Sequence, residues 1–118
     1  MTWLEYCGLC RTVSEGTLEP YSVACNIMST LTRLYRHGLL TGFKRRYYQL
    51  AHDMECAPPL DYEARDRFYS AIADDAGRLL EDAAARHGYV FETEEGDGAC
   101  YVLRPTEKRM PIVRRFYG

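Results

Sequence analysis

The clearest hydrophobic pattern in the chain lies over residues 22–37. Ile27, Leu31 and Leu34 recur at steps of four and three, the spacing that gathers apolar side chains into one stripe of an amphipathic helix. Gly38 follows, and glycine adopts the left-handed conformation that ends many helices at little cost. The pattern therefore predicts a helix from residue 22 to residue 37.

A longer helix is predicted over residues 62–87. Asp61 stands where an N-cap carboxylate belongs, and Gly88 closes the segment. The apolar residues that share one face are Phe68, Ile72, Ala76, Leu79 and Ala83. On the outer face, acidic and basic residues four positions apart support the same helix. Ala57-Pro58-Pro59 precedes it and separates two halves of the chain.

Other segments are less regular in their periodicity. Residues 2–13 place apolar side chains at approximately helical spacing, which indicates a first helix. The aromatic-rich segment Phe43–Leu50 favours a strand. Residues 89–103 alternate apolar and polar side chains around Glu95-Gly96-Asp97-Gly98, which predicts a β-hairpin.

Composition bounds the class of protein. The chain has 118 residues, 47% of them hydrophobic, which is enough for one ordinary domain core. No run of 18 apolar residues occurs, and residues 1–16 lack the basic start and apolar centre of a secretory signal. We therefore expect an intracellular protein, cytoplasmic or located at the nucleoid or in the nucleus, with no membrane partner.

The net charge of −2 conceals a strong segregation of charge along the chain. Residues 1–56 carry +1, residues 61–97 carry −7 and residues 104–118 carry +4. The acidic middle would repel a polyanion, so nucleic acid could be contacted only by the other two parts.

The polar side of the 22–37 helix and the segment after it hold side chains suited to DNA. The helix carries Asn26, Ser29, Thr30, Arg33 and Arg36. On an outward face, the first four could reach base edges in a major groove, and Arg36 could contact phosphates. Lys44, Arg45 and Arg46 form a basic turn that could clamp the sugar-phosphate backbone.

Residues 26–50, NIMSTLTRLYRHGLLTGFKRRYYQL, resemble the recognition helix and wing of winged helix-turn-helix proteins. The resemblance lies in the helix, Gly38-Leu39-Leu40, the basic turn and a strand at Tyr47–Leu50. It implies a small DNA-binding transcription regulator that binds double-stranded DNA. It also implies a homodimer formed through the alanine-rich helix at residues 61–87.

A second class of function is a non-enzymatic protein-interaction module, such as an inhibitor, an adaptor or an assembly subunit. The acidic helix could mimic a polyanion or dock on a basic partner, and Arg114–Tyr117 could serve as a tail anchor. Leu34-Tyr35-Arg36 also resembles the signature of the LYR-motif family, small helical accessory proteins of mitochondria. That resemblance implies three helices, a docking role for Arg36, and respiratory or iron–sulfur assembly partners.

Cysteine and histidine spacing raises the possibility of a structural zinc site. Cys7 and Cys10 form a C-x2-C pair, and His52 and Cys56 are four residues apart, so four ligands could complete a tetrahedron. Five cysteines at uneven spacing fit thiols or metal ligands better than a disulfide framework. No glycine-rich phosphate loop occurs, and His37 and His87 each precede a helix-ending glycine, so we expect no enzyme.

These patterns together predict an α+β fold in a single domain, residues 1–118. Residues 1–56 would form a helical, winged-helix-like half. Residues 57–118 would add the long acidic helix, the β-hairpin and a basic tail.

Overall fold

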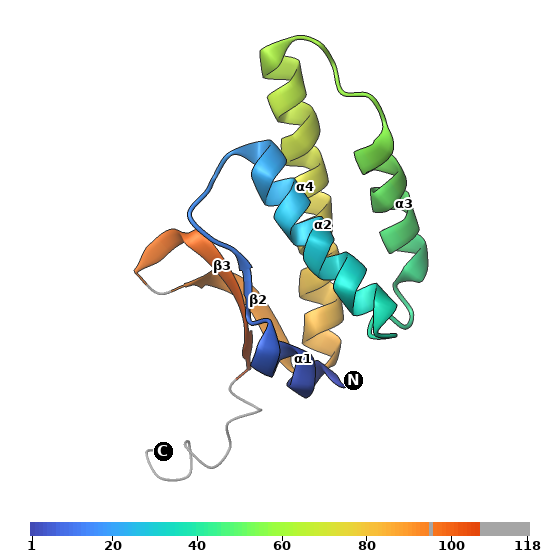
Figure 1. The fold of residues 1–118 in the computed structure, drawn as a ribbon, viewed down its shortest axis with the longest axis vertical. Helices are drawn as coiled ribbons and strands as arrows, with labels where there is room; N and C mark the ends of the chain where they lie inside the picture. Colours follow the sequence, from blue (N-terminus) through green and yellow to red (C-terminus); the bar gives the residue numbers. More distant parts are fainter. Residues whose placement is uncertain (95, 107–118) are drawn as a thin grey trace.

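The computed structural model describes residues 1–94 and 96–106 (Figure 1), so the predicted tail anchor at Arg114–Tyr117 lies outside the described residues. These residues form an α+β single domain in which a layer of helices lies beside an antiparallel sheet. The elements follow one another as α1 (Trp3–Leu9), β1 (Thr12–Ser14), α2 (Pro20–Arg36), α3 (Lys44–Glu55), α4 (Tyr62–Arg86), β2 (Tyr89–Glu94) and β3 (Asp97–Pro105). None of the helices in the described ranges is long and apolar enough to cross a membrane.

Helix α4 is the element on which the others are arranged. Asp61 caps it, with the carboxylate accepting a hydrogen bond from the Ala64 amide at 3.0 Å, and Gly88 follows its end with a φ of 81°. Its buried residues are Tyr69, Ile72, Ala76, Leu79, Leu80, Ala83 and Ala84. The predicted helix at 62–87 is confirmed, and its predicted apolar face is the face that packs inward.

Helix α2 lies across α4 and buries a stripe of its own. Pro20 occupies its first turn, where a missing amide hydrogen costs nothing, and the Glu19 side chain accepts a hydrogen bond from the Ser22 amide. The buried residues of α2 are Ala24, Ile27, Met28, Thr30, Leu31 and Leu34. The predicted helix at 22–37 is confirmed, with a start two residues earlier.

The sheet has the strand order β1-β3-β2, with every pairing antiparallel. Phe91 pairs with Leu103 in the β2–β3 hairpin, which confirms the hairpin predicted at residues 89–103. Thr12 pairs with Val102, so β1 adds to the other side of β3. The helix expected over residues 2–13 is shorter in the structure and ends at Leu9. The β-branched residues Thr12 and Val13, which favour strands, belong to β1 instead.

The strand predicted at Phe43–Leu50 is wrong, because Phe43 is the N-cap of helix α3 and residues 44–50 form its first part. Phe43, Tyr47 and Leu50 are all buried, and their spacing of four and three is a helical period. The aromatic content suggested a strand, but packing of this face against the other helices decides the conformation.

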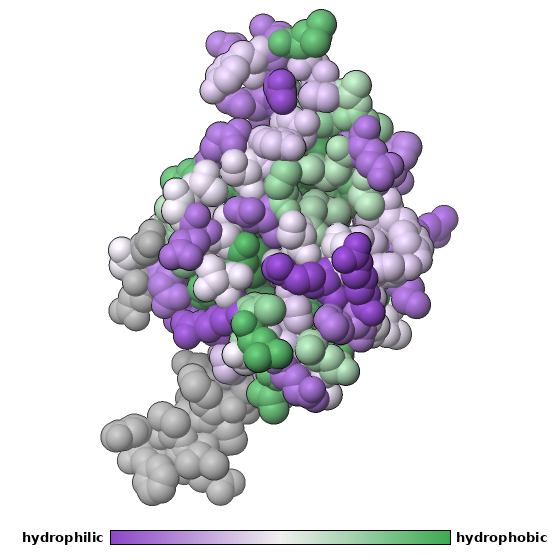
Figure 2. Space-filling model, viewed as in Figure 1, coloured by the Kyte–Doolittle hydropathy of each residue, from purple (hydrophilic) through white to green (hydrophobic). Residues whose placement is uncertain are grey.

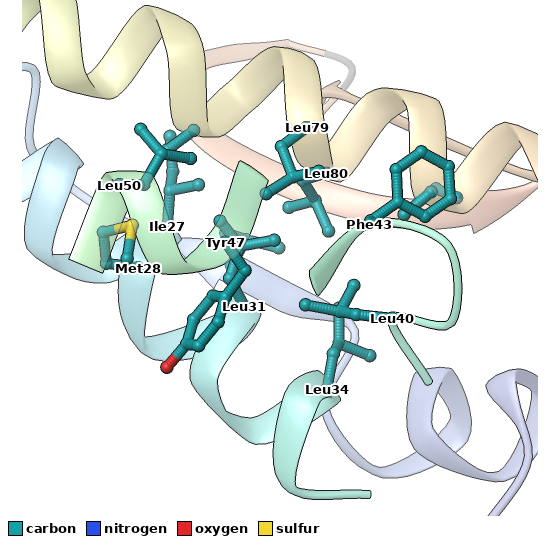
Figure 3. Close-up of a cluster of buried hydrophobic side chains, with 14 of the residues drawn as sticks. Ile27, Met28, Leu31, Leu34, Leu40, Phe43, Tyr47, Leu50, Leu79 and Leu80 are labelled. Atoms are coloured by element: carbon teal, nitrogen blue, oxygen red, sulfur yellow. The ribbon is translucent and has the colours of Figure 1, made fainter. Parts of the chain in front are cut away.

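The core between the three long helices is shown in Figure 3. Leu31 and Leu34 from α2 point toward Leu79 and Leu80 from α4, and all four side chains have no exposed surface. Tyr47 and Leu50 bring α3 onto the same cluster, and the turn before α3 adds Leu40 and Phe43. At one end, the Trp3 indole donates to the Leu39 carbonyl at 3.1 Å, which holds α1 beside the α2–α3 turn.

Candidate nucleic-acid interface

One end of the helical layer concentrates positive charge. Residues 20–52 contain five Arg or Lys residues and no Asp or Glu, and they fold into α2, a short turn and α3. Gly38 and Gly42 have positive φ angles of 71° and 88°, which lets the chain reverse in a few residues. The reversal places the last turn of α2 next to the first turn of α3. We call this region the basic end, made of Arg33, Arg36, Lys44, Arg45 and Arg46.

The start of α3 has an unusual charge for a helix N-terminus. Lys44, Arg45 and Arg46 are its first three residues, no side chain caps it, and its first turn has no acidic residue. Backbone amides at a helix N-terminus lack intrahelical acceptors and carry partial positive charge. Three cations therefore stand where a carboxylate or a phosphate would be favourable.

The five cations of the basic end differ in the ion pairs and hydrogen bonds that they make within the protein. Arg46 pairs with Asp82 of α4 at 2.8 Å. Arg33 donates to the Tyr6 hydroxyl at 3.3 Å and to the Thr30 hydroxyl at 3.4 Å. Among the described residues no ion pair involves the remaining three, and all of them are exposed: Arg36, Lys44 and Arg45.

The expected base-reading face of α2 is corrected by the structure. Thr30 has no exposed surface, and Asn26 is half-buried, with its amide donating to the Ser14 hydroxyl of β1 at 3.0 Å. Only Ser29, of the three uncharged residues, is exposed. The reason is visible in the spacing, because Thr30 lies three residues after Ile27 and four before Leu34 and so falls within the apolar stripe.

A tyrosine cluster beside the basic end was not anticipated from the sequence. Tyr35 of α2 stacks on Tyr47 of α3 with ring centroids 4.7 Å apart, and its hydroxyl is hydrogen-bonded to that of Tyr48. This hydrogen bond, followed by burial, raises the pKa of Tyr35. Tyr48 itself is 52% exposed, which leaves an aromatic surface close to Lys44.

The predicted zinc ligands do not come together. Cys7 and Cys10 belong to the α1 region beside the α2–α3 turn, whereas His52 and Cys56 lie at the opposite end of α3 (Figure 1). A helix of 12 residues is about 18 Å long, far more than a shared metal allows. No group of three or more potential ligands occurs in the described part of the chain. The zinc site predicted from these four residues is therefore wrong, because the fold separates the two pairs.

The wing expected at residues 44–50 is helical, so the β2–β3 hairpin is the remaining hairpin in the described residues that could contact a DNA backbone. Glu92 on β2 pairs with Arg104 at 2.8 Å, and Glu94 pairs with Arg11 at 3.4 Å. These arginines are neutralised by carboxylates on the same surface. The β2–β3 hairpin therefore offers no net positive charge to a phosphate backbone, and within residues 1–94 and 96–106 the basic end is the better candidate for such a contact.

The described residues form an α+β domain with a three-stranded antiparallel sheet and a cationic end at the α2–α3 turn. Comparison with known proteins gives no match: no family model, no curated protein and no solved structure matches this chain.

Proposed function

We propose that the protein binds double-stranded DNA through the phosphate backbone, using the basic end. The observation that carries the proposal is the start of α3, where Lys44, Arg45 and Arg46 are the first three residues and no side chain caps the backbone amides. Arg36 adds a fourth cation from the neighbouring end of α2. Phosphate oxygens would accept hydrogen bonds from the amides and neutralise the side chains.

The proposed contact differs from that of a base-reading helix. Asn26 and Thr30 are engaged inside the fold, so the surface offers cations and few groups that discriminate bases. Binding would be governed by counterion release, with affinity falling steeply as salt rises. A regulator built in this way would recognise duplex shape and charge more than sequence.

Dimerisation through α4, expected for such a regulator, is a separate proposal. The alanines that favoured it are largely used internally, because Ala76, Ala83 and Ala84 have no exposed surface. A dimer would have to use the outer face of α4, where Ala71 and Ala85 are exposed. Sedimentation equilibrium tests this point independently of DNA binding.

The central experiment is fluorescence anisotropy of a labelled 20-base-pair duplex at several KCl concentrations. We expect the logarithm of the wild-type binding constant to fall with the logarithm of salt concentration with a slope of about −3, roughly −0.9 for each of three to four neutralised phosphates. Arg45→Glu should weaken binding at least tenfold at low salt. Arg67→Glu makes the same change of net charge on the exposed surface of α4 and should leave the affinity nearly unchanged.

Two outcomes would overturn the proposal. One is the absence of salt-dependent binding to the duplex at micromolar protein concentration. The other is equal loss of affinity in Arg45→Glu and Arg67→Glu, since that result would reflect net charge alone and not the basic end.

A further inference from the structure

A hollow between α2 and α3 is distinct from the start of α3. Its volume is about 530 Å³, and it is lined by Cys25, Met28, Ser29, Thr32, Arg33, Arg36, Tyr47, Ala51, Met54 and Glu55. We call this hollow the α2–α3 groove. Figure 2 shows pale green, weakly apolar surface in the region between these helices, with strongly hydrophilic residues bordering it.

The lining residues form continuous faces of two helices. On α2 the positions run from Cys25 to Arg36 at steps of three and four, and on α3 they run from Tyr47 to Glu55 in the same way. The groove is therefore elongated along both helices. Helix α3 has 12 residues, so a third helix of about three turns would match its length.

The apolar part of the groove, which we call its floor, consists mainly of flexible side chains. Met28 lines it from α2, and Met54 and Ala51 line it from α3. Methionine is flexible and polarisable, and grooves that accept amphipathic helices use it to adapt to different side chains. An apolar floor disfavours nucleic acid as the occupant, because phosphates there would lose hydration without compensation.

The rim of the groove carries charge at both ends. Arg33 and Arg36 lie on it toward the basic end, and Glu55 lies on it at the far end of α3. The guanidinium of Arg36 is exposed and has no ion pair within the described residues. Two arginines beside an apolar floor complement a helix whose carboxylates flank its apolar stripe.

We propose that the α2–α3 groove binds an acidic amphipathic helix of a partner protein. The apolar residues of that helix, at i, i+3 or i+4 and i+7, would fill the space over Met28 and Met54. Carboxylates beside the stripe would pair with Arg33 and Arg36. The groove shares Arg33 and Arg36 with the basic end but does not include Lys44 or Arg45, so a substitution at Lys44 or Arg45 distinguishes this inference from DNA binding.

The probe is a synthetic 18-residue helical peptide with leucines at i, i+4, i+7 and i+11 and glutamates flanking them. Methyl NMR of protein labelled at methionine reports its position, since Met28 and Met54 lie in the groove and Met1 does not. We expect the signals of Met28 and Met54 to shift on titration while that of Met1 stays in place. A matched peptide with lysine in place of every glutamate should bind at least tenfold more weakly.

Two protein variants and a matched control locate the site. Ala51→Trp places a large ring in the groove from a half-buried position and should abolish the methionine shifts. Ala71→Trp makes the same change on the exposed face of α4 and should bind like wild type. Arg36→Glu reverses the charge of an exposed side chain on the rim and should weaken the acidic peptide at least fivefold.

The proposal is overturned if the acidic peptide produces no Met28 and Met54 shifts up to millimolar concentration, or if both peptides bind equally. It is also overturned if these signals depend on protein concentration without peptide, because a second copy of the chain would then occupy the groove. Lys44→Glu separates the two proposals. It should remove DNA binding and leave the acidic peptide bound.

Discussion

The Arg46 guanidinium lies 2.8 Å from the Asp82 carboxylate and joins the basic start of α3 to the acidic helix α4. Both side chains are about half exposed, at 47% and 57%, so solvent screens their attraction. The pair therefore contributes little to stability. Its larger effect is on charge: Asp82 neutralises Arg46, one of the three cations at the start of α3, and so lowers the positive charge available to a phosphate.

Asp82→Asn tests this competition. The substitution keeps the size of the side chain and removes its charge, so Arg46 becomes available to the duplex. We expect DNA affinity to rise by about threefold to tenfold at low salt, and the salt slope to steepen by about 0.9 for the one added phosphate contact. The free energy of unfolding should fall by less than about 1 kcal/mol, as is usual for exposed pairs. Anisotropy titrations and urea unfolding measure the two quantities. An unchanged slope would show that Arg46 does not reach the DNA.

Lys44→Glu should separate stability from binding. A carboxylate at the first position of α3 would face the positive end of the helix dipole, where wild type has a cation. We expect the variant to be more stable by about 0.5–1 kcal/mol, a rise in Tm of roughly 2–4 °C. DNA binding should be lost at the same time. Lys44→Gln should fall between wild type and Lys44→Glu in both measurements, which are thermal unfolding by circular dichroism and anisotropy.

A decrease in Tm on Lys44→Glu would contradict this account of the α3 N-terminus. It would mean that Lys44 makes a stabilising contact in the folded protein that outweighs the helix dipole.

The long helices and the hairpin could be predicted from the sequence because each has a local signal. Asp61 and Gly88 bracket α4, and the apolar period between them is regular. The failure at residues 43–50 has a physical cause, since Phe43, Tyr47 and Leu50 satisfy a helical period while their residue types favour a strand. Which tendency wins depends on the surface they pack against, and that surface comes from α2 and α4.

The candidate site was harder to predict than the fold. Lys44–Arg46 were recognised as basic, but their position at an uncapped helix start follows only from α3 being a helix. The bond between Asn26 and Ser14 joins residues whose contact depends on the β1–β3 pairing, which has no local sequence signal. The α2–α3 groove likewise depends on how far two helices diverge, a property set by long-range packing.

Gly77→Ala tests the packing between the helical layer and the sheet. A methyl group at this position would lie 3.6 Å from Phe91 and 4.0 Å from Ile27, which is ordinary van der Waals contact. Alanine also has the higher helix propensity, so we expect the variant to gain about 0.5–1 kcal/mol in the free energy of unfolding. Urea unfolding gives the value. A loss of stability would show that β2 lies closer to α4 than these distances indicate.

Gly38→Ala is the matched control for that substitution. A methyl group there would meet nothing within 4 Å, but Gly38 has a φ of 71°. The variant should lose about 1 kcal/mol through backbone strain alone. The two substitutions are chemically identical, so their opposite signs isolate backbone conformation from packing.

Glu19 should make the stability of the protein fall as the pH is lowered, through its role as the N-cap of α2. Its carboxylate accepts hydrogen bonds from the Ser22 side chain and amide, and these bonds lower its pKa from the usual 4.5. A lowered pKa in the folded state contributes stability that is complete above pH 4.5 and is lost as the pH falls through the folded-state value. Glu19→Gln removes the titrating group, so Tm measured from pH 6 to pH 3 should fall less steeply than in wild type.

Glu15→Gln removes an exposed carboxylate that caps no helix and should keep the wild-type slope. Parallel profiles for wild type and Glu19→Gln would show that the cap is not held by the ionised carboxylate.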